Sequence, residues 1–199
     1  MVLGLTGQTG AGKSTVCRML ENEQNICVVD ADQIARQVVT SGTDCLAEIV
    51  LHFSIIVLNE DGTLNRKKLA EIVFNDRSQL KELNRITFPH IVAGIKNEIK
   101  AGQQAGHSIV ILDAPLLFES KSDQLCDSIL AVLADTEIRK QRIMQRDGLT
   151  EQEAEARISS QHDDEFFLSR ADYIIRNDGD ATSLRLQVVE LLEKLRAKH

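Results

Sequence analysis

The sequence contains only two prolines, and it has no apolar run long enough to cross a lipid bilayer. A membrane-spanning helix needs about 20 mostly apolar residues, and a secretory leader needs a basic start before an apolar stretch, so we expect neither. Repeats and low-complexity tracts are also missing, which leaves little room for extended linkers. We therefore expect the 199 residues to fold continuously as a cytoplasmic protein without a membrane partner.

Basic residues and paired cysteine motifs are scarce as well. The chain carries 23 Lys and Arg against 30 Asp and Glu, a formal charge of −7. Because a nucleic-acid backbone requires a basic surface, this balance argues against a general nucleic-acid binder. The four cysteines show no CxxC spacing, so we interpret them as reduced core residues rather than a zinc or disulfide set. They are Cys17, Cys27, Cys45 and Cys126.

A glycine-rich segment near the start of the chain is the most informative feature that is present. Residues 6–15 read TGQTGAGKST and contain GxxxxGK followed by Ser, the pattern of a phosphate-binding loop. In such a loop, successive backbone N–H groups converge on phosphate oxygens. Lys13 then reaches the β- and γ-phosphates, and the Ser14 hydroxyl can take a Mg²⁺ position. The pattern favours a nucleotide enzyme over a glycine-rich turn without a ligand.

The surroundings of this loop support the same interpretation. The apolar run Val2–Leu5 predicts a short buried strand before it, and apolar residues at helical spacing over 15–23 predict a helix after it. The N-terminus of that helix adds its own attraction for anions. Four further apolar runs predict strands that alternate with helices. They are Ile26–Val29, Ile109–Leu112, Ile129–Leu133 and Tyr173–Ile175.

Five strands alternating with helices predict an α/β fold with a parallel sheet. Such sheets bind ligands outside the carboxyl ends of their strands, so we expect the loop at Gly7, Asp32 and Asp113 to share one cleft.

Two helical regions accompany the predicted sheet. The region 35–107 is too long for a simple crossover and could house the second substrate of a kinase. Its candidate core positions are Leu69, Ile72, Val73, Leu80, Leu83, Ile86, Ile91, Ile95 and Ile99. The segment 181–198 predicts an amphipathic closing helix that packs on the core. Its apolar positions are Leu184, Leu186, Val188, Val189, Leu191, Leu192 and Leu195.

Phosphoryl transfer needs positive charge, because the migrating group gathers negative charge on its equatorial oxygens. Arg139, Arg142 and Arg146 follow at spacings of three and four, which predicts one helix face that could close over the phosphates as a lid. The alternative is a solvated face paired with Glu137 and nearby acids.

Three aspartates follow predicted strands. Asp32 is the candidate general base that would accept the acceptor's hydroxyl proton, and it is also a candidate N-cap for a helix beginning near Gln33. For Asp30, support of the site and turn formation both stay open. Asp113 fits the strand-borne acid that orients Mg²⁺, with a structural turn before Pro115 as the alternative.

Six segments beyond the phosphate loop resemble the motifs of one family, the dephospho-CoA kinases. The loop alone is shared by many kinases and GTPases, whereas this ordered set is much more selective, and it extends over nearly the whole chain. The segments are VVDADQIARQVV at 28–39, DGTLNRKKLAEIVF at 61–74, APLLFE at 114–119, QRIMQRDGLT at 141–150, ARISSQ at 156–161 and ADYIIRNDG at 171–179.

The resemblance implies the fold of P-loop NTPases of the nucleoside-monophosphate-kinase type, with a five-stranded parallel sheet flanked by helices. One domain would span 1–199, with a helical acceptor-binding insert at about 35–107 and a lid at about 116–150. The implied reaction transfers the γ-phosphate of ATP to the ribose 3′-hydroxyl of dephospho-CoA, giving CoA and ADP in the last step of coenzyme A biosynthesis. ATP is then the co-substrate and Mg²⁺ the metal. We expect a monomer, and oligomerisation stays open as the alternative.

Individual roles come with the resemblance. Asp32 matches the family's proposed base, and Asn177 matches a position near the adenine. Three arginines fall in the family's lid, where Arg139 and Arg142 would act in catalysis together with Lys13, and Arg146 would contact ATP. The residues that match the ATP loop are Gly10, Ala11, Gly12, Lys13, Ser14, Thr15 and Val16. The residues that match the acceptor side are Arg66, Leu116, Leu117 and Phe118.

One departure from the family pattern concerns the helical insert. The family commonly shows a His-Pro pair there, whereas this chain has Phe88-Pro89-His90, with Phe at the usual His position. A shift of two residues along a helix turns the side chain by roughly 200°, so His90 is not expected to replace the missing histidine unless Pro89 changes the local path.

Three other functions predict different features. A nucleoside, nucleotide or shikimate kinase would lack the DAD and PLLFE segments. A regulatory GTPase would carry an NKxD-like guanine-reading segment, which we do not find. A noncatalytic nucleotide-binding module would show damage to the catalytic set, yet Lys13, Ser14, Asp32 and the three arginines are all present.

The Asp32→Asn variant tests the predicted base. We expect it to bind ATP as the unchanged protein does but to lose most of its phosphoryl transfer, because an amide cannot accept the acceptor's proton. Calorimetric titration with ATP and an assay of ADP release measure these two properties separately. Near-normal turnover in this variant would remove Asp32 as the base.

Overall fold

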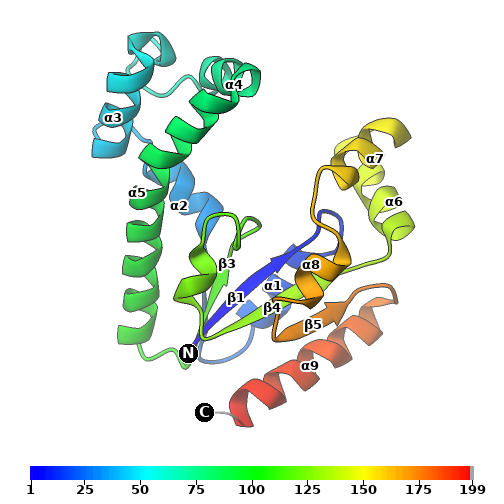
Figure 1. Ribbon diagram of the computed structural model, residues 1–199. Helices are drawn as coiled ribbons and strands as arrows, with labels where there is room; N and C mark the ends of the chain where they lie inside the picture. Colours follow the sequence, from blue (N-terminus) through cyan, green and yellow to red (C-terminus); the bar gives the residue numbers. More distant parts are fainter. Residues whose placement is uncertain (198–199) are drawn as a thin grey trace. The chain divides into compact units, whose positions relative to one another are not determined.

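The computed structural model describes residues 1–197 and contains one five-stranded, all-parallel sheet (Figure 1). All five strands predicted from the sequence are confirmed, each with an end displaced by no more than two residues. The strands are β1 (Val2–Gly7), β2 (Ile26–Asp30), β3 (Ile109–Asp113), β4 (Ser128–Leu133) and β5 (Tyr173–Arg176). They lie in the order β2-β3-β1-β4-β5, so β1 is central.

The register around β1 determines what meets the phosphate loop. Leu5 pairs with Asp113 of β3 on one side and with Leu130 of β4 on the other. Because the strands are parallel, their carboxyl ends share one edge of the sheet. The loop that follows β1 therefore begins beside the residue that ends β3.

Helices cover both faces of this sheet. The helices α1 (Lys13–Glu21) and α9 (Ala181–Ala197) pack against β1, β3, β4 and β5 to form the largest apolar core. On the other face, Phe167 of the short helix α8 (Asp164–Leu168) packs against Ala131 and Leu133 of β4.

The remaining elements of this part are α6 (Thr136–Asp147), α7 (Glu151–Ser159) and the 3₁₀ turn η2 (Ser122–Leu125). Two consecutive helices thus connect β4 to the segment that leads into α8.

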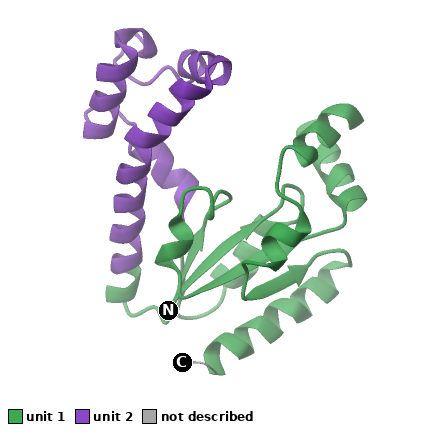
Figure 2. Ribbon diagram, in the orientation of Figure 1, with its two compact units in different colours: residues 1–29, 102–199 green, residues 30–101 purple. Residues whose placement is uncertain are grey.

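The chain divides into two compact units, residues 1–29 with 102–199 and residues 30–101 (Figure 2). The second unit is helical, as the sequence predicts for the region 35–107. It consists of α2 (Ala31–Gln37), α3 (Asp44–Phe53), the 3₁₀ turn η1 (Ile55–Val57), α4 (Arg66–Asn75) and most of α5 (Arg77–Gln104).

This helical unit has an apolar core of its own, which includes Ile49 and Phe53 from α3 and Val73 from α4. Of the predicted core positions, Leu69, Val73, Ile86, Ile95 and Ile99 are buried. Ile72, Leu83 and Ile91 are half-buried.

The prediction for Leu80 is wrong, because its side chain is 38% exposed. Leu80 lies in the first turn of α5, and this helix contributes to the core only from Leu83 onward. At 28 residues α5 is long, but no helix within residues 1–197 is long and apolar enough to cross a membrane.

The closing helix α9 buries a narrower stripe than the sequence pattern predicts. Leu184, Val188, Leu191, Leu192 and Leu195 are buried, and Lys198 of the predicted helix lies outside the described residues.

The predictions for Leu186 and Val189 are wrong, since these side chains are 61% and 43% exposed. Leu186 follows Leu184 by two residues, which turns its side chain about 200° away from the buried stripe.

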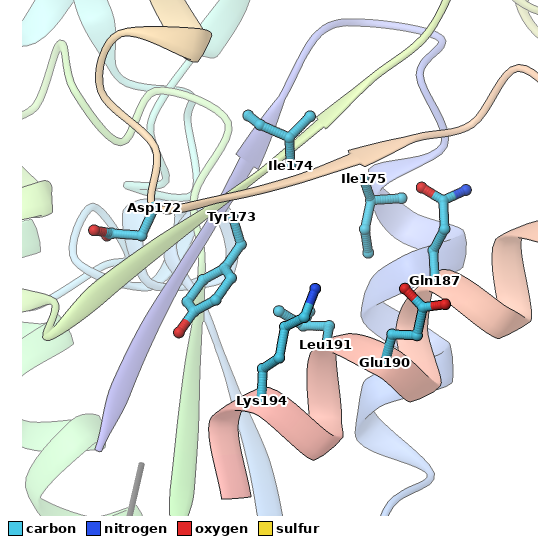
Figure 3. A pocket seen from close by; sticks show the side chains of 8 residues that line it. All are labelled: Asp172, Tyr173, Ile174, Ile175, Gln187, Glu190, Leu191 and Lys194. Atoms are coloured by element: carbon cyan, nitrogen blue, oxygen red, sulfur yellow. The ribbon is translucent and has the colours of Figure 1, made fainter. Parts of the chain in front are cut away.

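The outer edge of β5 is covered by α9 rather than by another strand. Gln187 of α9 accepts a hydrogen bond from the backbone N–H of Arg176 at 3.0 Å and donates one to the Arg176 carbonyl at 2.8 Å. Figure 3 shows Gln187 beside Ile175, above the polar ends of Glu190 and Lys194. A side-chain amide in the place of a neighbouring strand protects the sheet from edge-to-edge pairing.

Two leucines of α9 provide a matched test of this packing. We expect Leu191→Ala to lower the free energy of unfolding by about 2–5 kcal/mol, because it removes a side chain that is 4% exposed and leaves a cavity. Leu186→Ala makes the same chemical change on the same helix and should cost less than about 0.5 kcal/mol. Urea denaturation of both variants measures the difference, and equal losses would contradict the observed orientation of α9.

Candidate active site

The phosphate loop runs from the end of β1 at Gly7 to the start of α1 at Lys13. Gly12 caps α1 with φ at 95°, and Gly10 has φ at 77°. Both values lie in the left-handed region, which glycine enters without the penalty of a Cβ atom. The chain can therefore turn sharply and present the first N–H groups of α1 toward an anion.

The loop also packs too closely on its neighbours to tolerate side chains. A Cβ atom on Gly10 would lie 2.8 Å from the carbonyl oxygen of Arg139 in α6. A Cβ atom on Gly12 would lie 2.3 Å from Nδ2 of Asn177. Glycine at these two positions thus allows the loop to pack closely on α6 and Asn177, in addition to allowing the left-handed backbone conformation.

Asn177 and Arg142, which the sequence predicts for the site, donate hydrogen bonds to backbone carbonyls of the loop. The buried Asn177 side chain donates from Nδ2 to the Ala11 carbonyl at 2.8 Å. Arg142 donates from Nη2 to the Asn177 carbonyl at 3.0 Å and from Nη1 to the Gly10 carbonyl at 3.4 Å. These contacts turn loop carbonyls toward the protein, which suits a loop whose N–H groups bind phosphate.

Lys13 and Asp113 form an ion pair at the carboxyl edge of the sheet, and both side chains are largely buried. The structure therefore brings together two residues that the sequence predicts for the site. Cys17 lies next to them, where burial and then the charge of Asp113 raise the pKa of its thiol to about 12. A thiol with such a pKa stays protonated near neutral pH and is unreactive.

The other ATP-loop positions differ in exposure. Ser14 is exposed at the start of α1, as a metal-binding hydroxyl requires, and Thr15 is half-buried. Ala11 and Val16 have fully buried side chains, so only their backbone groups can reach a ligand.

Arg139 is a cation buried beside the loop, with only 4% of its surface exposed. Its Nη2 donates to Thr136 at 3.4 Å, while Nε and Nη1 find no hydrogen-bond partner within residues 1–197. Burial lowers the pKa of Arg139, and the charges of Asp164 and Asp135 oppose that shift. Because arginine stays charged in proteins, the side chain presents unused donors that suit an anion.

Arg146 does not join the other two arginines. Its exposed guanidinium donates from Nε and Nη2 to the Asp147 carboxylate at 2.7 and 2.8 Å, which lowers the pKa of Asp147 to about 2. The structure therefore places Arg139 and Arg142 at the loop and Arg146 in an ion pair at the end of α6.

The sequence leaves open that this helix face is paired with acids instead of forming a lid. Lys140 fits that description better than Arg139 or Arg142 does. Lys140, which is buried, pairs with Glu137, Glu151 and Glu155 at 3.1, 2.7 and 3.2 Å. The carboxylates, led by that of Glu151, raise the pKa of Lys140. This cluster joins α6 to α7, because two of the three acids belong to α7.

Sequence reasoning missed Gln8 within the loop and two residues outside it, Gln161 and Asp164, that accept hydrogen bonds from the loop. The Thr9 N–H donates to Oε1 of Gln161 at 2.8 Å, and Gln8 donates from Nε2 to Oδ1 of Asp164 at 2.9 Å. Gln8 occupies a variable position of the loop pattern, so the pattern does not indicate a role for its side chain. Gln161 ends the matched segment ARISSQ, so its place in that motif was the only available indication.

The predicted acceptor segment after β3 is mixed in exposure. Leu116 is exposed, whereas Leu117 is fully buried against Gly4, where a Cβ atom would lie 2.9 Å from Leu117 Cδ2. Phe118 packs edge-on against Phe166, with ring centroids 5.4 Å apart. Of these three residues, Leu116 offers the most side-chain surface to a ligand.

In the helical unit, Asp30 rather than Asp32 caps α2. The Asp30 side chain accepts from the N–H of Gln33 at 2.9 Å, so the capping alternative for Asp32 is wrong. The reason is that α2 begins at Ala31, one residue after β2 ends, which leaves Asp30 in the cap position. Asp32 is exposed in the first turn, so capping does not account for it.

The remaining predicted residues of this unit lie on α4 and α5. Arg66 begins α4 and donates from Nη2 to the Arg36 carbonyl at 3.4 Å. His90 lies 2.9 Å from Glu48 of α3 through its Nε2, and Phe88 is half-buried. Helix α5 continues through Pro89, so the proline does not bring His90 to the position of Phe88.

Comparison with known proteins agrees with this arrangement. The family model described as dephospho-CoA kinase matches residues 1–183. A dephospho-CoA kinase of Listeria innocua is 43% identical over 192 residues, 96% of each chain. The structure of a dephospho-CoA kinase from Campylobacter jejuni superposes with a TM-score of 0.73 at 30% identity, covering 98% of this chain and 96% of that one.

A shikimate kinase from Bacteroides thetaiotaomicron superposes with a TM-score of 0.54 at 16% identity, covering 98% of each chain, which shows a shared P-loop kinase fold. The family model covers most of the chain, and the Listeria innocua relative is 43% identical over 96% of each chain. These two matches show membership of a family as well as a shared fold. The chain therefore belongs to the dephospho-CoA kinases, the family that carries out the ATP-dependent final step of coenzyme A biosynthesis.

Proposed function

We propose that this protein transfers the γ-phosphate of ATP to the ribose 3′-hydroxyl of dephospho-CoA, giving CoA and ADP. Membership of the family supports the reaction, and one observation in the site carries it. Arg139 is a buried cation with unused donors, and its backbone packs directly against Gly10 of the phosphate-binding loop. A preorganised cation of this kind stabilises the charge that develops on a transferring phosphoryl group.

Lys13, Arg139 and Arg142 divide the charge compensation in this proposal. Lys13 exchanges its ion pair with Asp113 for the β- and γ-phosphates, as its place at the start of α1 supports. Arg139 acts on the transferring group, and Arg142 stabilises the loop through the Gly10 and Asn177 carbonyls. Arg146 contacts ATP only if it leaves Asp147, which makes it the weakest of the predicted ATP residues.

Ser14 and Asp113 are the groups that would hold Mg²⁺. Magnesium in kinase sites is bound by one or two carboxylates together with substrate phosphates, so a hydroxyl and a single carboxylate beside the loop suffice. Both residues lie at the carboxyl edge of the sheet, where the loop also lies. When bound, the ion would neutralise charge on the phosphates.

Asp32 is the proposed general base. It follows the end of β2 by two residues, and since Asp30 provides the helix cap, catalysis gives the exposed Asp32 carboxylate a role. A carboxylate within hydrogen-bond reach of the 3′-hydroxyl would accept its proton as the phosphoryl group arrives. The family resemblance supports the same assignment.

Arg66, Leu116, Leu117 and Phe118 are the proposed acceptor-side residues, with Leu116 the most exposed of the three after β3. Within the predicted lid range 116–150, residues 128–133 form β4, so we assign the lid function to α6. We also propose a single functional domain and a cytoplasmic monomer that uses neither nucleic acid nor membrane, on the basis of composition and charge.

The first experiment is an assay of ADP release with Mg-ATP and four conditions: dephospho-CoA, adenosine, shikimate and no acceptor. We expect release to depend on dephospho-CoA and the product to be heavier by one phosphate on the ribose. Mass spectrometry of the product checks the second point. ADP release that is indifferent to the acceptor would indicate an ATPase and contradict the proposal.

The Asn177→Ala variant separates two roles for that residue. The observed hydrogen bond to Ala11 predicts that its loss weakens the phosphate loop, so ATP and GTP should lose affinity by the same factor. Calorimetric titration with both nucleotides measures this. A loss confined to ATP would instead support the adenine contact that the resemblance implies.

A further inference from the structure

The segment 160–168, which we call the loop clamp, lies against the first variable residues of the phosphate loop. It follows α7 and contains α8. The Thr9 N–H donates to Oε1 of Gln161 at 2.8 Å, and Gln8 donates to Oδ1 of Asp164 at 2.9 Å. Two consecutive residues of the loop are therefore bound by side chains of one segment.

The clamp is itself anchored to the sheet. The second carboxylate oxygen of Asp164 accepts from Nη2 of Arg176, at the end of β5, at 2.9 Å. Phe167 of α8 is buried against Ala131 and Leu133 of β4. Because both oxygens of Asp164 are engaged, its position is determined from the loop on one side and from β5 on the other.

The same carboxylate acts on the buried arginine. Asp164 is the first of the acids whose charge favours the ionised form of Arg139 against the effect of burial. Gln8 is nearly fully buried, and its Oε1 has no hydrogen-bond partner within residues 1–197. Arg139 and Gln8 are thus buried polar side chains with unsatisfied atoms, and such groups depend strongly on their remaining partners.

We propose that Gln161 and Asp164 are positioning residues for phosphoryl transfer. Gln161 fixes the path of the loop backbone at Thr9, and Asp164 fixes the side chain of Gln8 while it is itself held by Arg176 of β5. Neither residue needs to touch ATP or the acceptor. Small displacements of groups that stabilise a transition state cost rate more than they cost ground-state binding, so the effect falls on turnover. This inference rests on the proposed kinase activity.

The test uses two clamp variants in the full chain, each with a matched control. Gln161→Ala removes the acceptor for Thr9, and Gln152→Ala removes an exposed glutamine from α7. Asp164→Asn keeps a carbonyl oxygen as acceptor for Gln8 but removes the charge near Arg139. Glu165→Gln removes an exposed charge from the same turn of α8.

We expect both clamp variants to lower kcat by about tenfold or more while KM for dephospho-CoA changes less than about twofold. Thermal midpoints should stay within about 2 °C of the unchanged protein, since Gln161 is exposed, Asp164 is half-buried and no buried apolar side chain is altered. Both controls should keep kcat. Asp164→Glu, which restores the charge, should recover part of the rate lost in Asp164→Asn.

Hydrogen exchange at the Thr9 amide provides a readout that needs no catalysis. The Thr9 amide should exchange faster in Gln161→Ala than in Gln152→Ala, because its hydrogen-bond acceptor is gone. If the unchanged protein phosphorylates nothing, the proposed function fails, while faster exchange at Thr9 would still support the clamp. Unchanged exchange, or kcat within twofold in both clamp variants, would overturn the inference.

Discussion

The close approach of the phosphate loop to α6 and Asn177 is the constraint on which the rest of the site depends. Side chains at Gly10 and Gly12 would meet the Arg139 carbonyl and the Asn177 amide at 2.8 and 2.3 Å. Their absence lets the loop lie on the backbone of α6 at Arg139, and it brings the Arg142 side chain within hydrogen-bond reach of the Gly10 carbonyl. The glycines therefore position the cations as well as the loop.

Charge at this site is balanced by different means for each cation. Lys13 has a carboxylate partner in Asp113, whereas Arg142 is held by backbone carbonyls and Arg139 keeps two unused donors. In the proposed reaction Lys13 leaves its ion pair with Asp113 to bind phosphate, whereas two donors of Arg139 have no partner to leave within residues 1–197. A buried cation without a full set of partners is costly in the resting protein, and this cost favours the anion-bound state.

Sequence patterns predicted the sheet well because buried parallel strands read as continuous apolar runs. They predicted helix faces less well. Leu186 and Leu191 are both leucines of α9, but Leu186 is exposed and Leu191 is buried. Only the direction in which each side chain points from the helix axis separates them. The cap of α2 was missed for a related reason. Asp30 and Asp32 are equally suited to capping, and a helix start at Ala31 decides between them.

The arginines of α6 show why spacing alone did not predict the site. Arg139, Arg142 and Arg146 share one periodicity, yet Arg146 is bound by Asp147, its immediate neighbour. Arg142 donates to Gly10 and Asn177, far away in the sequence, whereas Arg139 donates to Thr136 of its own helix. Periodicity describes where a helix points its side chains, while tertiary contacts determine what they meet.

The same limit applied to the clamp, since Thr9 and Gln161 are separated by 152 positions. No local pattern links such residues, but chain connectivity explains how they meet. The helices α6 and α7 leave the carboxyl end of β4, and the chain must return to begin β5 beside it. On its return it passes the end of β1, where the phosphate loop begins. A motif at the end of α7 is therefore delivered to the loop by the order of strands in the sheet.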